Sequence, residues 1–449
     1  MTMSSRKAPF QTEVLPNGWV VTQAGADGTL ARAWSLLPED ARIHRAEGRA
    51  AAEELLSRAR RARAWEKQVP AHWRAVPTGL DLQVHLRHPG QPHKETLEGG
   101  LESALAGGYD SIVSMPNTAP FLDTPEALLA AQQQAEGLAA DYPVRIGFAA
   151  SATRGMKGEE PTDVKALGAA GAVAITDDGW GVKSEAAQEA LFAACADADL
   201  LFQQHAEMPG HGGVTPAGPF REKHNLPEYP RSAESGMIRR DLALLRKHPK
   251  ARYHVLHVTT KESVDEIRRA KAEGLRVSAE VTPHHLIFSN HEIPDAADPR
   301  CTYFKMNPPL FAPEDRAALR AALADGTIDC VSTDHAPHEK ELKAKGWVQS
   351  PFGTRGLETA LPALLTLVAE GALTWERLEE VFSAAPRRLL KRPEFAEPSG
   401  LLFVDPEARY QVDLAELPGI SENSCFLGAT LQGRIELRLE PVAAYSRAN

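Results

Sequence analysis

The sequence has few cysteines and no long apolar run, and each shortage excludes a class of protein. Its 449 residues include only 4 cysteines, which are widely spaced and form no Cys-x-x-Cys pair. We therefore expect neither a disulfide framework nor a cysteine-based zinc site, and this cysteine usage favours a reduced, cytoplasmic setting. The longest apolar stretch, Thr359–Leu373, is too short to span a bilayer and is interrupted by Pro362 and Glu370, so no membrane segment is expected. The N-terminus lacks the apolar region of a signal peptide.

Basic residues are outnumbered by acidic ones. The chain has 50 Lys+Arg against 60 Asp+Glu, a formal net charge of −10. Its one basic cluster, Arg58–Arg63, lies in a stretch of helical character with nearby glutamates, which indicates a solvated helix face. The charge therefore argues against nucleic acid or an anionic membrane as the main partner.

Histidine, in contrast, is frequent, with 16 residues distributed unevenly along the chain. Their positions become informative once the repeating organisation of the middle of the chain is laid out. From about residue 79 to 335, short β-rich apolar runs alternate with Ala/Leu/Glu-rich segments of helical period. The expected strands are Gly79–Leu86, Asp110–Asn117, Val144–Ser151, Gly171–Asp178, Leu200–Glu207, Arg252–Thr259, Arg276–Pro283 and Ile328–His335.

Helices are expected between these strands, and some begin with typical caps, such as Thr124 before Pro125 and Ser184 before a Glu/Ala run. Eight strands alternating with helices predict an α/β fold of the (β/α)₈ TIM-barrel type, with a doubly wound open sheet as the alternative. We place the barrel at residues 76–395.

The two ends of the chain differ from this pattern. Residues 1–75 contain an expected strand at Gly18–Thr22 and a long Ala/Arg/Glu-rich helix at Glu39–Lys67. The C-terminal segment, residues 396–449, includes a stretch of alternating apolar character at Leu401–Pro441, as in Arg434–Leu439. We expect the N-terminal segment to contribute this helix and to join the C-terminal β-rich segment in a small appendage to the barrel.

Residues that can bind metal follow several of the expected strands. His85, Asp177 or Asp178, His205, His257 and Asp334 fall at the carboxyl ends of strands one, four, five, six and eight. A barrel of this kind forms its active site at that end of the strands. Any one histidine there could still be an ordinary hydrogen-bonded core or surface residue. Five such residues in register favour a metal site, and nitrogen and oxygen donors without thiolates suit zinc or a similar divalent ion.

At this point the sequence resembles the dihydroorotases of the amidohydrolase superfamily. Asp81–Gly90 (DLQVHLRHPG) is similar to the family signature D-x-H-x-H-x-R-x-P-G. Further matching motifs follow in family order over about residues 79–390, namely His93–Thr96, Met115–Thr118, Thr176–Gly179, Glu280–His285, Lys305–Pro309, Ser332–His338, Pro351–Gly353 and Gly356–Thr359. The first 75 and last 50 residues resemble the family much less clearly.

The resemblance implies a zinc-dependent enzyme with one or two ions. Dihydroorotases interconvert N-carbamoyl-L-aspartate and L-dihydroorotate in pyrimidine biosynthesis, and zinc can acidify water and polarise the amide carbonyl. By the family pattern, His85 and Asp334 would hold the first metal, His205 and His257 the second, and Asp178 would bridge them. Asp334 would also be the catalytic base that returns a proton to the ring nitrogen.

The same resemblance implies the residues that bind substrate. Arg87, Asn117 and His338 match positions that bind its carboxylate, and arginine suits this role because its planar fork meets both oxygens. Asn307, Phe352 and Gly353 match positions that hold the ring. The Lys/Glu-rich stretch Glu339–Lys345 is interpreted as a mobile lid or an ordinary solvated loop. A homo-oligomer is also expected.

One residue departs from the family signature: Gln83 replaces its first histidine. Three interpretations stay open. The enzyme works with Gln83 near the first metal, or only the Asp178/His205/His257 metal binds well, or the chain is a non-catalytic subunit that scaffolds aspartate carbamoyltransferase. Every other ligand and substrate residue is present, which favours activity. An aspartate at position 178, where hydantoinase-like relatives use a carboxylated lysine, argues against a hydantoinase- or allantoinase-type cyclic amidase.

Overall fold

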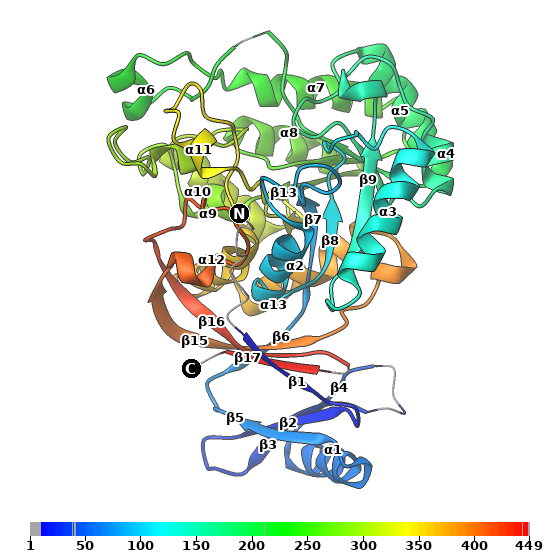
Figure 1. Ribbon diagram of the computed structural model, residues 1–449, viewed down its shortest axis with the longest axis vertical. Helices are drawn as coiled ribbons and strands as arrows, with labels where there is room; N and C mark the ends of the chain where they lie inside the picture. The colour runs from blue at the N-terminus through cyan, green and yellow to red at the C-terminus, as the bar shows by residue number, and fades with distance from the viewer. Residues whose placement is uncertain (1–9, 38, 40–41, 211, 442, 448–449) are drawn as a thin grey trace.

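The computed structural model describes residues 10–37, 39, 42–210, 212–441 and 443–447. Its largest element is an eight-stranded parallel sheet in which each strand pairs with its neighbour in the chain (Figure 1). These strands are β7 (Gly79–Val84), β8 (Tyr109–Ser114), β9 (Arg145–Ser151), β10 (Ala174–Thr176), β11 (Leu201–Gln204), β12 (Arg252–Val255), β13 (Val277–Val281) and β14 (Cys330–Val331). The sheet closes through a parallel bridge between Val84 and His335, where His85 N donates to His335 O at 2.9 Å. The predicted (β/α)₈ barrel is therefore confirmed.

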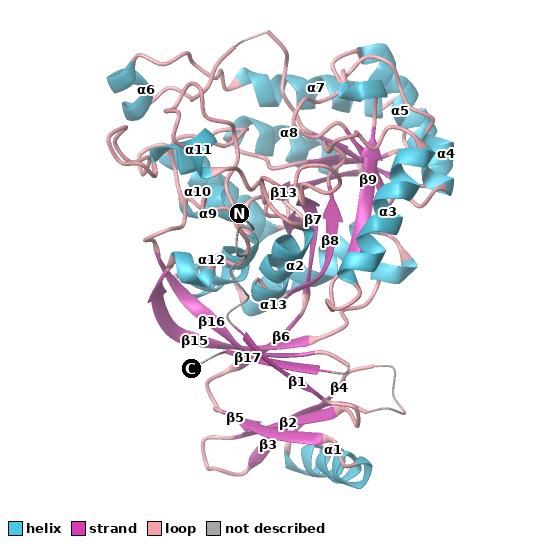
Figure 2. Ribbon diagram, in the orientation of Figure 1, coloured by secondary structure: helices cyan, strands magenta, loops and turns pink. Residues whose placement is uncertain are grey.

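Helices surround the barrel, as the secondary-structure colouring of Figure 2 shows. The expected caps are present, since the Thr124 and Ser184 side chains accept hydrogen bonds from the first turns of α3 and α5. The helices of this layer and of the connecting loops are α2 (Leu97–Ala106), α3 (Pro125–Ala139), α4 (Val164–Ala169), α5 (Glu185–Ala198), α6 (Pro219–His224), α7 (Ser232–Leu245), α8 (Lys261–Ala272), α9 (Pro283–Ile287), α10 (Pro313–Asp325), α11 (Lys340–Lys343) and α12 (Leu357–Ala369). No helix in the described part of the chain is long and apolar enough to cross a membrane.

The lower end of the barrel is closed by the helices that follow α12. These are α13 (Trp375–Glu379), a π-helical turn at Glu380–Ala384 and α14 (Ala385–Leu390). Leu390 and Phe395 join inward-facing strand residues such as Leu80, Leu82 and Val113 in one buried cluster. The opposite, carboxyl end of the strands is thus left for polar side chains.

Two further sheets lie below the barrel in Figure 1. The first is a five-stranded antiparallel sheet built from both ends of the chain, with β1 (Phe10–Val14), β6 (Arg74–Pro77), β15 (Leu401–Gln411), β16 (Thr430–Leu439) and β17 (Ala443–Arg447). The second has four strands, β2 (Trp19–Ala24), β3 (Leu30–Leu36), β4 (His44–Glu47) and β5 (Trp65–Val69), with α1 (Arg49–Ala62) beside it. Trp19, Trp34 and Phe403 belong to the apolar cluster between the two sheets.

The predicted helix Glu39–Lys67 is wrong in its extent. The helix starts only after Gly48, whose φ of 83° is not helical, and ends at Arg63 in the left-handed region. The flanking residues form β4 and β5, which pair with β3 and β2. Tertiary pairing with distant strands here outweighs the helix propensity of the local sequence.

Candidate active site

Five residues that can bind metal meet at the carboxyl end of the barrel. His85 follows β7, Asp178 follows β10, His205 follows β11, His257 follows β12 and Asp334 follows β14. All five side chains are buried. They form two groups of three that share Asp178.

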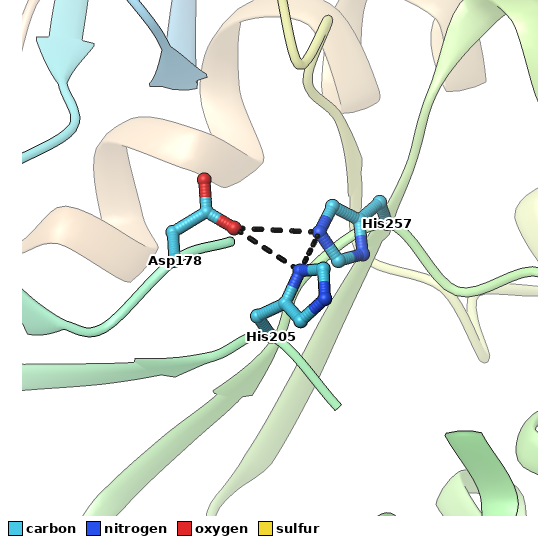
Figure 3. Close-up of side chains that lie close together, drawn as sticks. All are labelled: Asp178, His205 and His257. Carbon is cyan, nitrogen blue, oxygen red and sulfur yellow. Dashed lines mark hydrogen bonds and ion pairs between the residues drawn. The ribbon is translucent and has the colours of Figure 1, made fainter. Parts of the chain in front are cut away.

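The first group consists of Asp178, His205 and His257 (Figure 3). His205 Nδ1 lies 3.0 Å from His257 Nε2, and Asp178 Oδ1 lies 3.4 Å and 3.5 Å from these two nitrogens. Ligand atoms on a tetrahedral zinc ion, at bond lengths of about 2.0–2.1 Å, are separated by about 3.3 Å. The three atoms therefore have the spacing of one face of such a coordination sphere.

The second group consists of His85, Asp178 and Asp334. His85 Nε2 lies 3.1 Å from Asp178 Oδ2 and 3.0 Å from Asp334 Oδ1. Asp178 thus directs one carboxylate oxygen to each group, the arrangement expected of a bridging ligand. The other ring nitrogen of His85, Nδ1, lies 2.8 Å from Asn117 Oδ1, a contact that leaves Nε2 available for a metal ion.

Gln83 is fully buried beside this second group. Its Nε2 donates to Asp178 Oδ2 at 3.0 Å, while its Oε1 has no hydrogen-bond partner within the described ranges. An amide nitrogen cannot ligate a metal, whereas an amide oxygen is a weak neutral donor. In this orientation the glutamine amide would compete with a metal ion for Asp178 Oδ2, and it adds no ligand of its own.

The backbone at the site is strained. Arg87, His257 and Asp334 have φ values of 61°, 32° and 48°, a region that non-glycine residues seldom adopt and that costs of order 1–3 kcal/mol each. The buried carboxylate of Asp81 supports the turn at Asp334, since it accepts hydrogen bonds from the backbone N–H groups of Thr333 and of Gln83 in β7. Such strain is typical of positions where a side chain must be aimed at a site.

The two groups favour positive charge. Burial opposes the charged ring of His85, but hydrogen bonds to Asp178 and Asp334 outweigh it and raise its pKa to about 9. Burial likewise opposes charge on His205, and its contacts with Asp178 and Glu207 raise its pKa to about 10. Protons and divalent ions would therefore compete for the same nitrogens.

A cavity of about 620 Å³ opens onto the two groups. The predicted site residues that line it are His85, Arg87, Asn117, Asp178, His205, Asn307, Asp334, His338, Phe352 and Gly353. Gln83 and His257 lie behind this lining as buried residues. All the predicted site residues are thus at or next to one cavity.

Arg87 supplies positive charge to the cavity wall, and His338 lies beside it. Arg87 Nε donates to Pro337 O at 3.1 Å, and its NH2 group lies 3.2 Å from His338 Nε2. Burial lowers the pKa of Arg87 to about 10, against the carboxylates of Asp334 and Glu339, so the guanidinium stays charged at neutral pH. Burial also keeps His338 neutral by lowering its pKa well below the usual value, with Arg87 acting in the same direction.

Three residues that sequence reasoning missed support this cavity. Lys343 in α11 donates from Nζ to Pro351 O at 2.9 Å and to Gly353 O at 2.8 Å, and it is 1% exposed. Asn423 donates to Gly353 O and accepts from His338 N. Glu207 contacts His205 and Asn307. The stretch interpreted as a lid or solvated loop thus contains a buried anchor, Lys343.

A third cluster with ligand-type residues, His254, Glu280 and Cys330, lies on the strands themselves. His254 Nε2 lies 2.9 Å from Glu280 Oε2 and its Nδ1 lies 2.8 Å from Ser278 Oγ. Both ring nitrogens of His254 therefore already have protein partners, and we assign this cluster to the packing of the barrel interior.

Comparison with known proteins places this geometry in context. Residues 74–263 match the family model described as "Dihydro-orotase-like". The dihydroorotase of Brevibacillus brevis is 38% identical over 442 residues, covering 94% of this chain and 96% of the relative. The dihydroorotase of Halalkalibacterium halodurans is 40% identical over 375 residues, covering 81% and 85% of the two chains.

Solved structures share the fold at lower identity. An L-hydantoinase from Arthrobacter aurescens superposes with a TM-score of 0.77 at 23% identity, covering 94% of this chain and 95% of that one. The dihydroorotase of Saccharomyces cerevisiae in complex with 5-fluoroorotic acid gives 0.64 at 17% identity, covering 81% and 98%. These structures show the shared fold, and the near full-length sequence relatives show that the chain belongs to the dihydroorotase family.

Proposed function

We propose that this protein is a dihydroorotase that interconverts N-carbamoyl-L-aspartate and L-dihydroorotate. The observation that carries the proposal is Asp178, whose two carboxylate oxygens face two separate groups of ligands. The same cavity is lined by Arg87, His338 and Asn117, a set suited to an anionic substrate.

We propose zinc as the metal, in one or two ions. His205, His257 and Asp178 would hold the tighter ion, and His85, Asp334 and Asp178 the weaker one beside Gln83. The nitrogen and oxygen donors and their spacing fit this metal. When bound, the ion supplies Lewis acidity for the amide carbonyl and a more acidic water.

The substrate is oriented by the chain's own residues. The Arg87 guanidinium would bind the substrate carboxylate, with Asn117 and His338 at its sides. Asn307, Phe352 and Gly353 would hold the ring, and Lys343 and Asn423 fix the carbonyl of Gly353 from behind. This orientation would present the scissile amide to the two metal groups.

Asp334 would move the proton. Its Oδ1 contacts His85, while its Oδ2 has no hydrogen bond from any residue the structure describes. In hydrolysis this carboxylate would take a proton from the attacking water and return it to the departing ring nitrogen. In cyclisation the same proton would travel in reverse.

The residues of β10 argue against the alternative of another cyclic amidase. The strand and the turn after it read Ala-Ile-Thr-Asp-Asp, with no lysine available for carboxylation. Asp177 does not replace Asp178, because its Oδ1 accepts hydrogen bonds from Ala152 N and Thr153 N. Asp178 alone therefore fills the bridging position.

The test is turnover by purified, zinc-supplied protein. We expect hydrolysis of L-dihydroorotate at alkaline pH and cyclisation of N-carbamoyl-L-aspartate at acidic pH. Hydrolysis of hydantoin or allantoin instead would indicate the other amidase. Absence of every activity, together with binding to aspartate carbamoyltransferase, would indicate the scaffold.

Assembly, location and domain boundaries complete the proposal. Four expectations stay predictions: a homo-oligomer, an association with aspartate carbamoyltransferase, a cytoplasmic location, and domain boundaries at residues 75/76 and 395/396. Light scattering gives the molar mass of the purified protein alone, which tests the homo-oligomer. The same measurement with aspartate carbamoyltransferase added tests the association.

A further inference from the structure

Glu207 joins a candidate metal ligand to a candidate substrate ligand. It follows β11 two residues after His205, and its carboxylate lies outside the two groups that share Asp178. Its Oε2 lies 3.0 Å from His205 Nε2, and the same oxygen accepts a hydrogen bond from Asn307 Nδ2 at 2.7 Å. One carboxylate oxygen therefore contacts both side chains.

The contact with His205 decides which ring nitrogen carries the proton. Figure 3 shows Nδ1 of His205 directed at Asp178 and His257, with the second ring nitrogen on another side. A metal ion needs the lone pair of Nδ1, which places the proton on Nε2. A carboxylate at Nε2 stabilises this tautomer and fixes the plane of the ring.

The contact with Asn307 fixes a side chain of the cavity. Asn307 lies in the loop after Phe304, far from β11 in sequence, and its Oδ1 has no partner among the described residues. With Nδ2 held by Glu207, the amide presents this buried oxygen as a free acceptor. A ring N–H of the substrate is the kind of donor that such an acceptor binds.

The other ligand group has a parallel arrangement. His85 Nδ1 contacts Asn117 Oδ1 at 2.8 Å, and Asn117 also lines the cavity. Each group thus has one histidine whose ring nitrogen directed away from the other ligands contacts a further side chain. That side chain either lines the cavity, as Asn117 does, or binds a residue that lines it, as Glu207 does. At His85 one amide makes both contacts. At His205 the carboxylate of Glu207 contacts both the ring and the amide of Asn307, and His205 Nε2 and Asn307 Nδ2 also lie 3.3 Å from each other.

We propose that Glu207 is a positioning residue that couples metal binding at His205 to substrate binding at Asn307. The proposal rests on the proposed function, because it takes the Asp178/His205/His257 group as the tighter zinc site. Glu207 orients the two side chains and does not touch the reacting atoms.

The experiment compares Glu207→Ala, Glu207→Gln and Asn307→Ala with wild-type protein. The affinity for the first zinc ion is measured by competition with a chromophoric chelator. Binding of 5-fluoroorotic acid to the zinc-loaded protein is measured by calorimetry. Glu222→Ala, which removes an exposed acid on α6, is the matched control and should change neither affinity.

We expect Glu207→Ala to weaken the first zinc by about 10–100-fold and to weaken 5-fluoroorotic acid as well. Asn307→Ala should weaken only 5-fluoroorotic acid. Glu207→Gln keeps an acceptor for Asn307 but loses the charge, so zinc affinity should fall more than ligand affinity. Glu207→Gln also keeps the proposal testable if the alanine variant does not fold.

Three results would overturn the coupling. In the first, both Glu207 variants bind zinc and 5-fluoroorotic acid with wild-type affinity. In the second, both variants lose affinity for zinc alone, and in the third they lose affinity for 5-fluoroorotic acid alone. A wild-type protein that binds no zinc would overturn the proposed function itself, and this outcome is distinct because it appears before any substitution is made.

Discussion

At the scale of single residues, Gln83 distinguishes the two candidate metal groups. Both groups share Asp178, but the His85/Asp334 group has a glutamine amide hydrogen-bonded to Asp178 Oδ2 where the family signature has a histidine. In the Asp178/His205/His257 group, no amide of a described residue donates a hydrogen bond to Asp178 Oδ1. The two groups should therefore differ in metal affinity.

Replacing Gln83 with histidine should restore the weaker group. Gln83→His adds an imidazole donor at the position. We expect the second zinc ion to bind at least about 10-fold more tightly, since loss of a residue that only supports a ligand already changes metal affinity by about 10–100-fold. Zinc content after dialysis, measured by atomic emission, tests this. Gln83→Met is the control that removes the amide without adding a donor, and equal zinc content in both variants would contradict the prediction.

Asp334→Asn tests the proton-transfer role. The amide keeps the shape of the side chain but cannot take a proton, so kcat for dihydroorotate hydrolysis should fall by about 10²–10⁴-fold. Thermal unfolding should stay close to wild type, because no hydrogen bond to Asp334 Oδ2 is made by the described residues. Retention of most of the turnover would exclude Asp334 as the base.

Protons should oppose metal binding. The raised pKa values of His85, about 9, and of His205, about 10, mean that both rings are protonated at neutral pH when no ion is bound. Metal binding must release these protons, so apparent zinc affinity should increase as pH rises from about 6 to 9. A zinc affinity that does not change over this range, measured by chelator competition, would contradict this electrostatic account.

At the scale of elements, the short helix α11 supports the cavity wall. It carries Lys343 into a buried position among backbone carbonyls, with no carboxylate partner among the contacts that the structure describes. Burial lowers the pKa of this lysine well below its usual value. The segment from His338 to Gly353 is therefore anchored at its centre.

Lys343→Met should loosen this wall. Methionine keeps most of the volume but leaves carbonyls without a donor, which costs about 1–3 kcal/mol per unsatisfied group. We expect the KM for dihydroorotate to rise more than kcat falls, together with a lower Tm. Lys340→Met on the same helix removes only a surface ion pair with Glu422 and should have little effect. Equal kinetics in the two variants would disprove the anchoring role.

At the scale of the whole molecule, the barrel and the added sheets are joined by buried polar contacts. Asp110, at the start of β8, accepts hydrogen bonds from Thr78 Oγ1 at 2.6 Å and Arg387 NH2 at 2.7 Å, and also binds Ser399. Burial raises the pKa of Asp110, but Arg387 and Arg145 outweigh it and lower the pKa to about 2. The carboxylate thus connects the foot of the barrel to the segment that leads into β15.

Asp110→Asn should destabilise the protein by about 3–5 kcal/mol at pH 7, because it leaves Arg387 buried without its counter-charge. A lowered folded-state pKa stabilises the protein above the unfolded value near 4, and this stability is lost as pH falls toward 2. The difference in free energy of unfolding between wild type and Asp110→Asn, measured by urea denaturation, should therefore shrink as pH falls from about 4 to 2. Asp141→Asn, at an exposed position, should show no such difference.

Much of this molecule could be predicted from local sequence, and what was missed depends on contacts between distant segments. The barrel strands are short apolar runs, and the polar residues after them fall at one rim for geometric reasons, which is why His85 and Asp334 could be placed at one site. Their pairing on one metal came from the family resemblance. Strand β5 (WEKQV) contains helix-favouring residues and becomes a strand through its pairing with β2. Glu207 and Asn423 were missed because they contact residues far along the chain, Asn307 and Gly353 respectively. Lys343 was missed because a lysine in a charged stretch is ordinarily exposed.

The most direct test of the account is zinc titration of metal-free protein with dihydroorotate hydrolysis followed at each step. We expect no turnover without metal, and turnover that appears with the zinc ion bound by Asp178, His205 and His257. Asp178→Ala should abolish both tight zinc binding and turnover. Full activity of the metal-free protein, or inactivity with zinc bound and substrate supplied, would contradict the central claim.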